Sequence, residues 1–220
     1  MKLHYCVPTR NRFDLARAGI AAALAGSLVP DRVVVLDNSD RAEAAGHLAD
    51  LVTAGVEVVP QRGNLGVSAS WNWFLRHLED HVVIANDDAV PGPETCRALV
   101  GAAQADTTEV FFGVTGDDGN AFSIFLLRKR GWQRIGPFEE AFYPAYYEDD
   151  DYAHRLRLAG YRVVRVPGAT FEHLGSATYQ AYKAEQQEQH RRAVRVNRRR
   201  YLAKWGGLPG NERFSTPYGT

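Results

Sequence analysis

Short apolar runs alternate with helix-length stretches through the first half of the chain. The runs RVVVL at 32–36 and VVIA at 82–85 are continuously apolar, without the alternation of a strand that has one face in water. Such runs between helical stretches predict a mostly parallel sheet covered by helices on both faces. The predicted strands are 3–7, 32–36, 56–59 and 81–85, and the predicted helices are 12–28, 40–54, 66–78 and 93–103.

The second half is more mixed in pattern. Strands are predicted at 109–115, 122–127 and 161–166, and a helix at 148–159 is followed by Gly160, which suits a helix cap. A long polar helix, or a pair of helices, is predicted over 177–204. With 220 residues in all, we expect one α/β domain with a helical C-terminal extension.

Composition excludes several other classes of protein. The chain is 45% hydrophobic and 24% charged, which is typical of a soluble globular protein and not of a disordered chain, a collagen or a coiled coil. Cys6 and Cys96 are too few for a disulfide framework or a cysteine zinc site. With so few cysteines we expect a reducing, cytoplasmic compartment. We find no signal peptide and no apolar run long enough to span a bilayer, so we expect no transmembrane segment.

The formal net charge of zero conceals two charged segments. Residues 139–151 contain six acids and no base, and residues 191–204 contain seven bases and no acid. The basic stretch could contact nucleic acid, with Tyr201 and Trp205 stacking on bases. A solvated helix face, or arginines that pair with acids or donor phosphates on the same domain, is the interpretation we favour.

Polar residues follow the predicted strands at their carboxyl ends, where ligands bind in parallel sheets. Thr9-Arg10-Asn11-Arg12 after the first strand suits a phosphate or a base, or simply begins the next helix. Asp37 after the second strand could accept hydrogen bonds from a ribose or a pyrimidine, or cap a helix. Neither strand is followed by G-x-G-x-x-G, so a dinucleotide-binding dehydrogenase is not expected.

Two further segments carry candidate chemistry. Asp87 and Asp88 are adjacent carboxylates after a buried strand, and they suit Mg²⁺ or Mn²⁺ or else form an Asx-rich turn. Four acids in succession at 148–151 exceed what a helix dipole needs, and one whose pKa is raised by its neighbours would serve as a general base. His173, which follows a strand, is a candidate metal ligand.

Taken in serial order, these segments resemble glycosyltransferase family 2, and most nearly its rhamnosyltransferase-like members. The similarity covers nearly the whole chain. The segments that carry it are VPTRNR at 7–12, VLDNS at 35–39, RGNLG at 62–66 with WN at 71–72, NDD at 86–88, GPFEEAF at 136–142, EDDD at 148–151 with RL at 155–156, GYRV at 160–163, His173, and YLAKWG at 201–206.

The resemblance implies the GT-A fold, a Rossmann-like, mostly parallel central sheet flanked by helices. Residues 1–176 would form the glycosyltransferase domain, with a nucleotide-binding half at about 1–90 and an acceptor and catalytic half at about 91–176. Residues 177–220 would form the basic helical extension. This sequence has Asn86 where the family's D-x-D element begins with aspartate.

The resemblance also implies roles for particular residues. Asp88 and His173 would hold Mn²⁺ or Mg²⁺, and Asp149 would be the catalytic base, with Glu148 as the second candidate. The donor nucleotide would be held by a set of residues from the first four strand ends: Pro8, Thr9, Arg10, Arg12, Asp37, Asn64, Gly66 and Asp87.

The implied reaction is an inverting transfer of a hexosyl or deoxyhexosyl group from a nucleoside-diphosphate sugar to an acceptor hydroxyl. The acceptor stays open between a glycan, a lipid-linked sugar, a protein and a modified nucleic acid, and a homo-oligomer is compatible with the resemblance. Three alternatives remain. They are a sugar transferase that reaches nucleic acid through the basic helix, an inactive relative that only binds nucleotide, and a nucleotidyltransferase.

Overall fold

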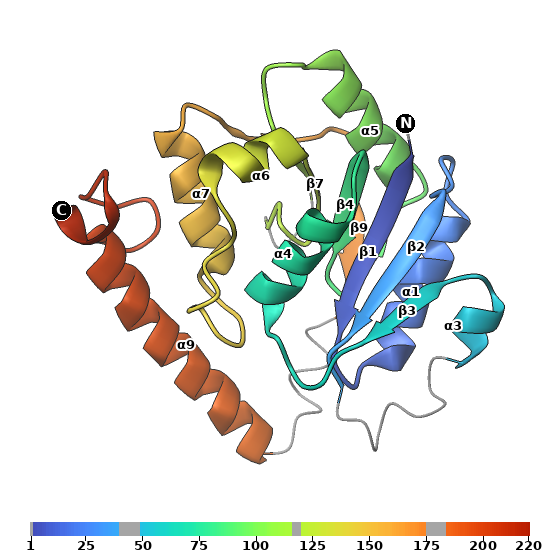
Figure 1. Ribbon diagram of the computed structural model, residues 1–220, viewed down its shortest axis with the longest axis horizontal. Coiled ribbons are helices and arrows are strands. Elements are labelled where there is room, and N and C mark those ends of the chain that lie inside the picture. Colours follow the sequence, from blue (N-terminus) through green and yellow to red (C-terminus); the bar gives the residue numbers. More distant parts are fainter. Residues whose placement is uncertain (1, 40–48, 116–119, 175–183) are drawn as a thin grey trace.

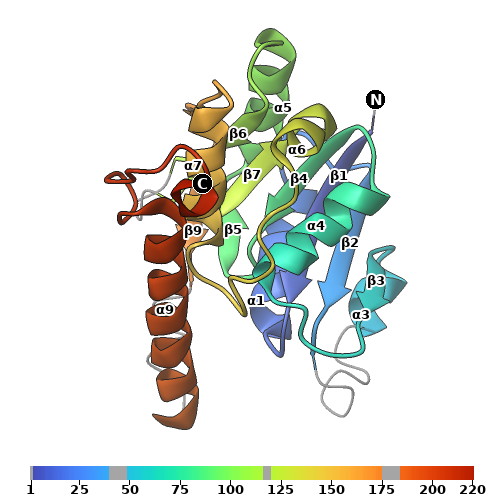
Figure 2. The same cartoon turned by 60° about the vertical axis from the view of Figure 1, so that its left-hand side comes forward.

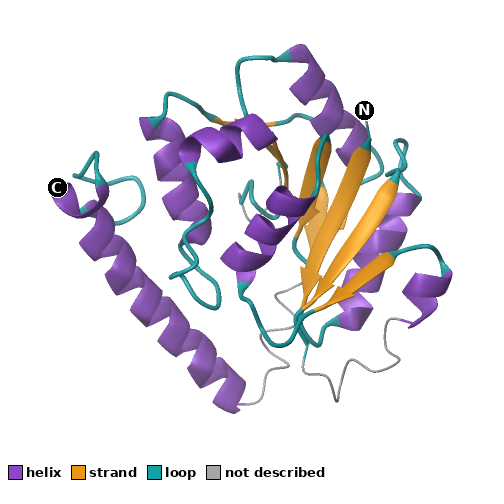
Figure 3. Cartoon of the chain, in the orientation of Figure 1, coloured by secondary structure: helices purple, strands orange, loops and turns teal. Residues whose placement is uncertain are grey.

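The computed structural model describes residues 2–39, 49–115, 120–174 and 184–220. Its centre is a seven-stranded sheet in the order β3-β2-β1-β4-β7-β6-β8, beside a two-stranded sheet of β5 and β9 (Figures 1 and 3). The strands are β1 Leu3–Thr9, β2 Arg32–Asp37, β3 Glu57–Pro60, β4 His81–Ala85, β5 Ala89–Pro91, β6 Phe111–Gly113, β7 Ile124–Leu127, β8 Val163–Arg165 and β9 Phe171–His173. The helices are α1 Phe13–Leu24, α3 Ala49–Thr53, α4 Val67–His77, α5 Thr95–Ala105, α6 Lys129–Ile135, α7 Glu148–Leu158, α9 Ala184–Trp205 and the short 3₁₀ helix η1 Pro217–Gly219.

The sheet is parallel where the sequence is most regular. Strands β3, β2, β1 and β4 run parallel to one another, as the continuous apolar runs predicted. Strand β7 is antiparallel to both of its neighbours, β4 and β6, while β8 is parallel to β6. The predicted mostly parallel α/β sheet is confirmed, and β7 is its antiparallel member.

Two layers of helices bury the two faces of the sheet. Alternate residues along β1 point to opposite faces: Tyr5 and Val7 belong to the core that packs on α1 and α5, and Cys6 belongs to the core that packs on α4 and α7. Both faces are apolar because both are covered, which is why these strands do not alternate in the sequence. Figure 2 shows α1 and α4 on opposite sides of the strands.

Several elements differ from those predicted. The described part of the predicted helix 40–54 is α3, because 40–48 lie outside the described residues, and of the helix predicted over 177–204 the described part begins at residue 184. Of the strand predicted at 109–115, only residues 111–113 form a strand, which is β6. The elements β5, β9 and α6 were not predicted. Three-residue strands and a seven-residue helix are too short to give a periodic signal.

Helix α9 packs beside α7 (Figures 1 and 2). Tyr201 and Trp205 are buried with Phe142 in a third apolar cluster. The side chain of Asn197 is fully buried and donates to the carbonyl of Ala145 at 2.8 Å. Within the described residues, no helix combines the length and apolar composition needed to cross a bilayer.

Candidate active site

The carboxyl ends of β1 and β2 lie side by side at one edge of the sheet. The register pairs Thr9 with Asp37, and the backbone N–H of Asn38 donates to the carbonyl of Thr9 at 2.8 Å. Pro8, near the end of β1, is half-buried, and in the turn that leads into α1 Arg12 is half-buried and Arg10 is exposed. The residues predicted to hold the nucleotide from these two strands are therefore gathered at one edge.

Asp37 is itself buried, and it shapes the turn after β2. One of its carboxylate oxygens accepts the backbone N–H of Ser39 at 2.9 Å, and the Ser39 hydroxyl accepts the N–H of Asn11 at 2.8 Å. These bonds tie the loop after β2 to the loop after β1. The structure thus gives Asp37 a turn-forming role, and its other carboxylate oxygen has no hydrogen bond among those described.

Asn64 and Gly66 form the turn that begins α4. The Asn64 side chain accepts the backbone N–H of Gly66 at 2.9 Å, and Gly66 has φ +80. A Cβ atom at Gly66 would lie 2.9 Å from both the carbonyl oxygen of Pro144 and the ring of Tyr143. The backbone N–H of Val67 also donates to Pro144 at 2.8 Å, so this turn is packed directly onto the loop that precedes α7.

Asp87 follows β4 and points back to β1. Its carboxylate accepts the hydroxyl of Thr9 at 2.9 Å. Burial and the neighbouring charge of Asp88 raise the pKa of Asp87 to about 7, although the Thr9 bond and the charge of Arg12 oppose the rise. Two adjacent carboxylates in a partly enclosed site would be relieved by a cation between or beside them.

Asp88 lies next to His173 through the small sheet. The pairing of β5 with β9 places Ala89 opposite His173, and the N–H of Leu174 donates to the carbonyl of Asp88 at 2.8 Å. The imidazole Nε2 of His173 is 3.2 Å from a carboxylate oxygen of Asp88. Residues 85 apart in sequence, predicted as partners in one metal site, are thus brought together by β5 and β9.

The side chains of Asp88 and His173 carry ligand atoms that suit a divalent cation. A carboxylate and an imidazole are ligands that Mn²⁺ accepts, and Mg²⁺ or Mn²⁺ commonly takes its remaining ligands from substrate phosphates and water. The described residues contain no group of three or more histidine, cysteine, aspartate or glutamate side chains arranged for a metal.

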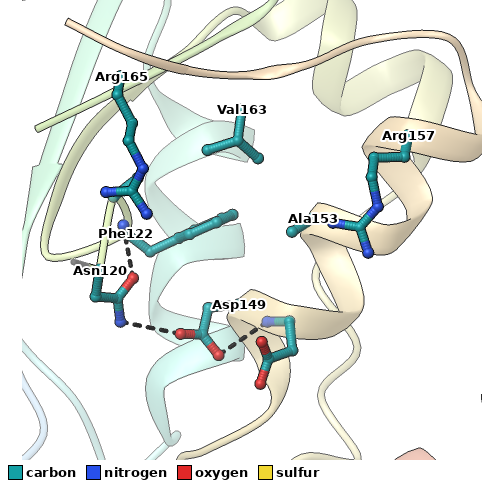
Figure 4. Close-up of a pocket in the computed structure, with 9 residues that line it drawn as sticks. Asn120, Phe122, Asp149, Ala153, Arg157, Val163 and Arg165 are labelled. Carbon is teal, nitrogen blue, oxygen red and sulfur yellow. Dashed lines mark hydrogen bonds between the residues drawn. The ribbon is translucent and has the colours of Figure 1, made fainter. Parts of the chain in front are cut away.

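The four acids at the start of α7 point to different surroundings. Asp149 accepts the side-chain N–H of Asn120 at 3.0 Å and the backbone N–H of Asp150 at 2.9 Å (Figure 4). Burial raises the pKa of Asp149, and these two hydrogen bonds oppose the rise. Asp149 lines an open pocket of about 410 Å³ between α7, β8 and the turn that leads into β7.

Glu148 is buried, whereas Asp149 and Asp150 are half-buried. The side chain of Glu148 is buried, and its Oε2 has no hydrogen-bond partner in the described part of the chain. Burial, followed by the charge of Asp149, raises the pKa of Glu148 well above its usual range, which favours the protonated acid. Asp150 lines the pocket, and burial together with the charge of Asp149 raises its pKa to about 7.

Asp151 is fully buried and faces α9. Its carboxylate is 2.7 Å from Nζ of Lys204, accepts the indole N–H of Trp205 at 2.8 Å and pairs with Arg155 at 2.9 Å. This ion pair joins the acidic segment to the basic segment. No pattern in the sequence links residue 151 to residue 204, so sequence reasoning missed it.

The arginines of α9 are mostly on its outer face. Arg191 and Arg195 pair with Glu188 on the same helix, and Arg192, Arg198 and Arg199 are exposed. The aromatic residues Tyr201 and Trp205, which would have to be accessible to stack on bases, are buried instead. The solvated-face interpretation accounts for these residues, and stacking by Tyr201 and Trp205 does not occur.

A short turn connects the metal candidates to the base candidate. The backbone N–H of Asn86 donates to the carbonyl of Ser123 at 2.9 Å, and the N–H of Ser123 donates to the carbonyl of Asn120 at 3.2 Å. Asn120 in turn holds Asp149. Sequence reasoning missed Asn120 and the pocket residues Phe122, Arg157 and Arg165, because no motif or periodicity distinguishes them from other loop and surface residues.

Comparison with known proteins identifies the family. Residues 5–163 match the family described as Glycosyl transferase family 2. The chain therefore belongs to glycosyl transferase family 2, and the predicted membership is confirmed at that level. The rhamnosyltransferase-like subgroup stays a prediction, and a sequence search of curated proteins found no match.

Solved structures with the same fold are nucleotide-sugar transferases. The mannosyltransferase PcManGT from Pyrobaculum calidifontis, in complex with GDP-Man and Mn²⁺, aligns with TM-score 0.66 and 18% identity over 79% of this chain and 56% of its own. S. aureus TarS 1–349 in complex with UDP-GlcNAc aligns with TM-score 0.60 and 16% identity over 83% of this chain and 62% of its own.

A third structure is glucosyl-3-phosphoglycerate synthase from Mycobacterium tuberculosis in complex with Mn²⁺, UDP and phosphoglyceric acid, with TM-score 0.61 and 16% identity over 78% of this chain and 70% of its own. At these identities the likeness shows the fold, which is GT-A. The chain spans little more than half of the mannosyltransferase it matches. Neither the family nor these structures favours a nucleic-acid acceptor or an inactive nucleotide-binding relative.

Proposed function

We propose that this protein transfers a sugar from a nucleoside-diphosphate sugar to an acceptor hydroxyl, with inversion at the anomeric carbon. One observation carries the proposal. Asp149 lines an open pocket, and the residue that holds it, Asn120, belongs to the turn that also anchors the Asp87–Asp88 segment. A carboxylate suited to take a proton and an acidic segment suited to a divalent cation thus belong to one connected site.

The donor side of the site is assigned to the edge formed by β1, β2 and β4. Thr9, Arg10 and Arg12 would contact the diphosphate, and Asp37 would face the base or ribose, with Pro8, Asn64, Gly66 and Asp87 completing the pocket. Asp88 and His173 would hold Mn²⁺ or Mg²⁺. When bound, that cation would supply positive charge to the leaving diphosphate. The sugar would be of the hexosyl or deoxyhexosyl type.

The acceptor side is assigned to Asp149. Its carboxylate would take the proton of the acceptor hydroxyl, the hydroxyl oxygen would form the new bond to the anomeric carbon, and the bond to the diphosphate would break with its electron pair leaving on the diphosphate. Glu148 is the weaker candidate, because its raised pKa favours the protonated acid, which cannot accept a proton.

The test compares two isosteric substitutions. Asp149→Asn removes the base and should reduce sugar transfer about 10²- to 10⁴-fold while nucleotide binding is kept. Glu148→Gln is the matched control, since a neutral amide resembles the protonated acid, and it should change transfer far less. Initial rates of nucleoside-diphosphate release measure both. Transfer at the wild-type rate in Asp149→Asn, or a greater loss in Glu148→Gln, would overturn the assignment.

A further inference from the structure

The pocket beside Asp149 contains both acids and bases. Its lining includes Asp149 and Asp150 at the start of α7, Arg157 two turns further along that helix, and Arg165 at the end of β8. Figure 4 shows the guanidinium groups of Arg157 and Arg165 on opposite sides, with the Phe122 ring between them and Asp149 below. The donor-side residues at the edge of the sheet do not line it.

The spacing on α7 aligns the acid with the base. Asp149, Ala153 and Arg157 are four residues apart, so they lie on one face of the helix. Their Cα atoms span about 12 Å of helix rise, and helical side chains lean toward the N-terminus, so the guanidinium reaches back toward Asp149. Both groups therefore face one pocket from the same side of α7, which suits a ligand that has a hydroxyl at one end and a charged group at the other.

Arg157 is held in place by the C-terminal segment. Its Nη2 donates to Glu212 at 3.1 Å, and the same Glu212 oxygen accepts the hydroxyl of Tyr201 at 2.6 Å. All the hydrogen bonds described for Arg157 use Nη2, so the pairing with Glu212 orients the guanidinium and leaves Nε and Nη1 for a ligand. The side chain of Arg157 is 51% exposed.

Arg157 and Arg165 lie above Asp149 in Figure 4, at the end of the pocket away from that carboxylate. In the described part of the chain, no ion pair joins Arg157 to Asp149 or Asp150. Burial, followed by the charges of Asp149 and Glu212, raises the pKa of Asp150 to about 7, and the charge of Arg157 opposes the rise. Near neutral pH Asp150 is therefore partly protonated. Phe122, Ala153 and Val163 supply apolar surface for the rest of the ligand.

We propose that this pocket selects an acceptor that carries a carboxylate or phosphate group, held by Arg157 and Arg165 while the acceptor hydroxyl faces Asp149. Guanidinium groups form paired hydrogen bonds with the oxygens of such anions. The inference rests on the proposed function, because it treats the pocket beside Asp149 as the acceptor site. It adds the chemical class of the acceptor.

The experiment compares matched neutral and anionic probes on the full chain with UDP and Mn²⁺ present. The probes are glucose against glucose 6-phosphate and glucuronate, and glycerol against glycerol 3-phosphate, with binding measured by ligand-observed NMR. At least one anionic probe should bind about tenfold more tightly than its neutral partner, since a charge-assisted hydrogen bond is worth about that much. The phosphate and carboxylate arms show which anion is preferred.

Substitution then tests the two arginines. Arg157→Met and Arg165→Met should each remove the preference for the anionic probe, and Arg192→Met, at an exposed arginine of α9, should leave it unchanged. Because Arg157 also pairs with Glu212, Arg165→Met is the variant that leaves that contact intact. Nucleotide binding, followed by the thermal shift with UDP or GDP and Mn²⁺, should be the same in all three variants.

Three results would overturn the inference. They are equal binding of every neutral and anionic pair, a preference that survives both substitutions, and loss of nucleotide binding in Arg157→Met or Arg165→Met, which would assign the arginines to the donor diphosphate. A wild-type chain that binds no nucleotide would instead contradict the proposed function. The two failures are therefore distinguishable.

Discussion

Each of the four acids at the start of α7 has its own surroundings, and their chemistry follows from them. Glu148 is buried without a partner for one oxygen, Asp149 is held by Asn120 beside the pocket, and Asp151 forms a buried ion pair. Burial raises the pKa of the first two, and the two hydrogen bonds to Asp149 oppose that rise. Carboxyl groups that lie close together in the sequence thus become a buried acid, a candidate base and a structural anchor.

Removal of the Asn120 amide should change the pH dependence of transfer. Its hydrogen bond favours the charged form of Asp149, so Asn120→Ala should raise the pKa of Asp149. A base must be deprotonated, so activity falls as pH drops through that pKa, and the acid limb of kcat/KM against pH should move to higher pH. An acid limb that stays in place or moves to lower pH would show that Asn120 does not tune this carboxylate.

Gly66 is required by its backbone and its neighbours. At φ +80 and with Pro144 and Tyr143 within 2.9 Å of a Cβ atom, Gly66→Ala should lower the free energy of unfolding by about 2 kcal/mol or more and weaken nucleotide binding. Gly63→Ala is the matched control, because a Cβ there meets nothing within 4 Å. Urea denaturation measures both variants, and equal losses would contradict the explanation.

At the scale of elements, β5, β9 and α9 bring the site together. The pair β5 and β9 places His173 beside Asp88, although neither strand has more than three residues. Helix α9 holds the start of α7 through Asp151, and it holds the preceding loop through Asn197. The loop that α9 anchors also packs against the turn at Gly66, so α9 supports both that turn and the start of α7.

The ion pair between Asp151 and Lys204 should dominate the attachment of α9. Lys204→Met leaves the buried Asp151 carboxylate with Arg155 and Trp205, so the loss of stability should be somewhat below the cost of about 3–5 kcal/mol for a fully unpaired buried charge. Arg199→Met, at an exposed arginine of the same helix, should change the free energy of unfolding by less than about 0.5 kcal/mol. Urea denaturation compares the two, and similar stability in both variants would show that this pair does not anchor α9.

At the scale of the whole molecule, the parallel register creates one binding edge. Strands β1, β2 and β4 end at the same side of the sheet, and β1 lies between the other two. From β1 the chain adds β2 and β3 on one side, and it then returns to the other side of β1 to form β4. Ligands of open α/β sheets bind at such a point. The site thus depends on strand order as much as on the identity of its residues.

Nucleotide and metal should stabilise the whole domain together. A nucleoside diphosphate at about 100 times its Kd adds about 2.7 kcal/mol to the free energy of unfolding, which corresponds to a rise in Tm of several degrees for a chain of this length. We expect this shift with UDP or GDP only when Mn²⁺ or Mg²⁺ is present. A thermal-shift panel of nucleoside diphosphates with and without each metal measures it.

Two variants sharpen the panel. Asp88→Asn combined with His173→Ala should remove the metal-dependent part of the shift, and Asp149→Asn should retain it. A shift that is the same without metal, or that persists in the double variant, would contradict the assignment of Asp88 and His173 as metal ligands.

The sequence by itself determined the local structure and the residues at the strand ends. Continuous apolar runs predicted β1, β2 and β4 because buried strands need apolar side chains on both faces, and the residues after them were recognisable because parallel strands expose their carboxyl ends together. The order of these motifs along the chain also predicted the family, which the comparison confirms.

Only the tertiary structure decided which side chains meet. The pairs Asp88 with His173, Asp149 with Asn120 and Asp151 with Lys204 join residues 29 to 85 positions apart, and short strands and loops bring them together without any periodic signal. Burial, which raises the pKa of Glu148 and Asp149, likewise depends on the packed neighbours and not on the acid itself. The formal net charge of zero therefore conceals a buried ion pair between Asp151 of the acidic segment and Lys204 of the basic segment.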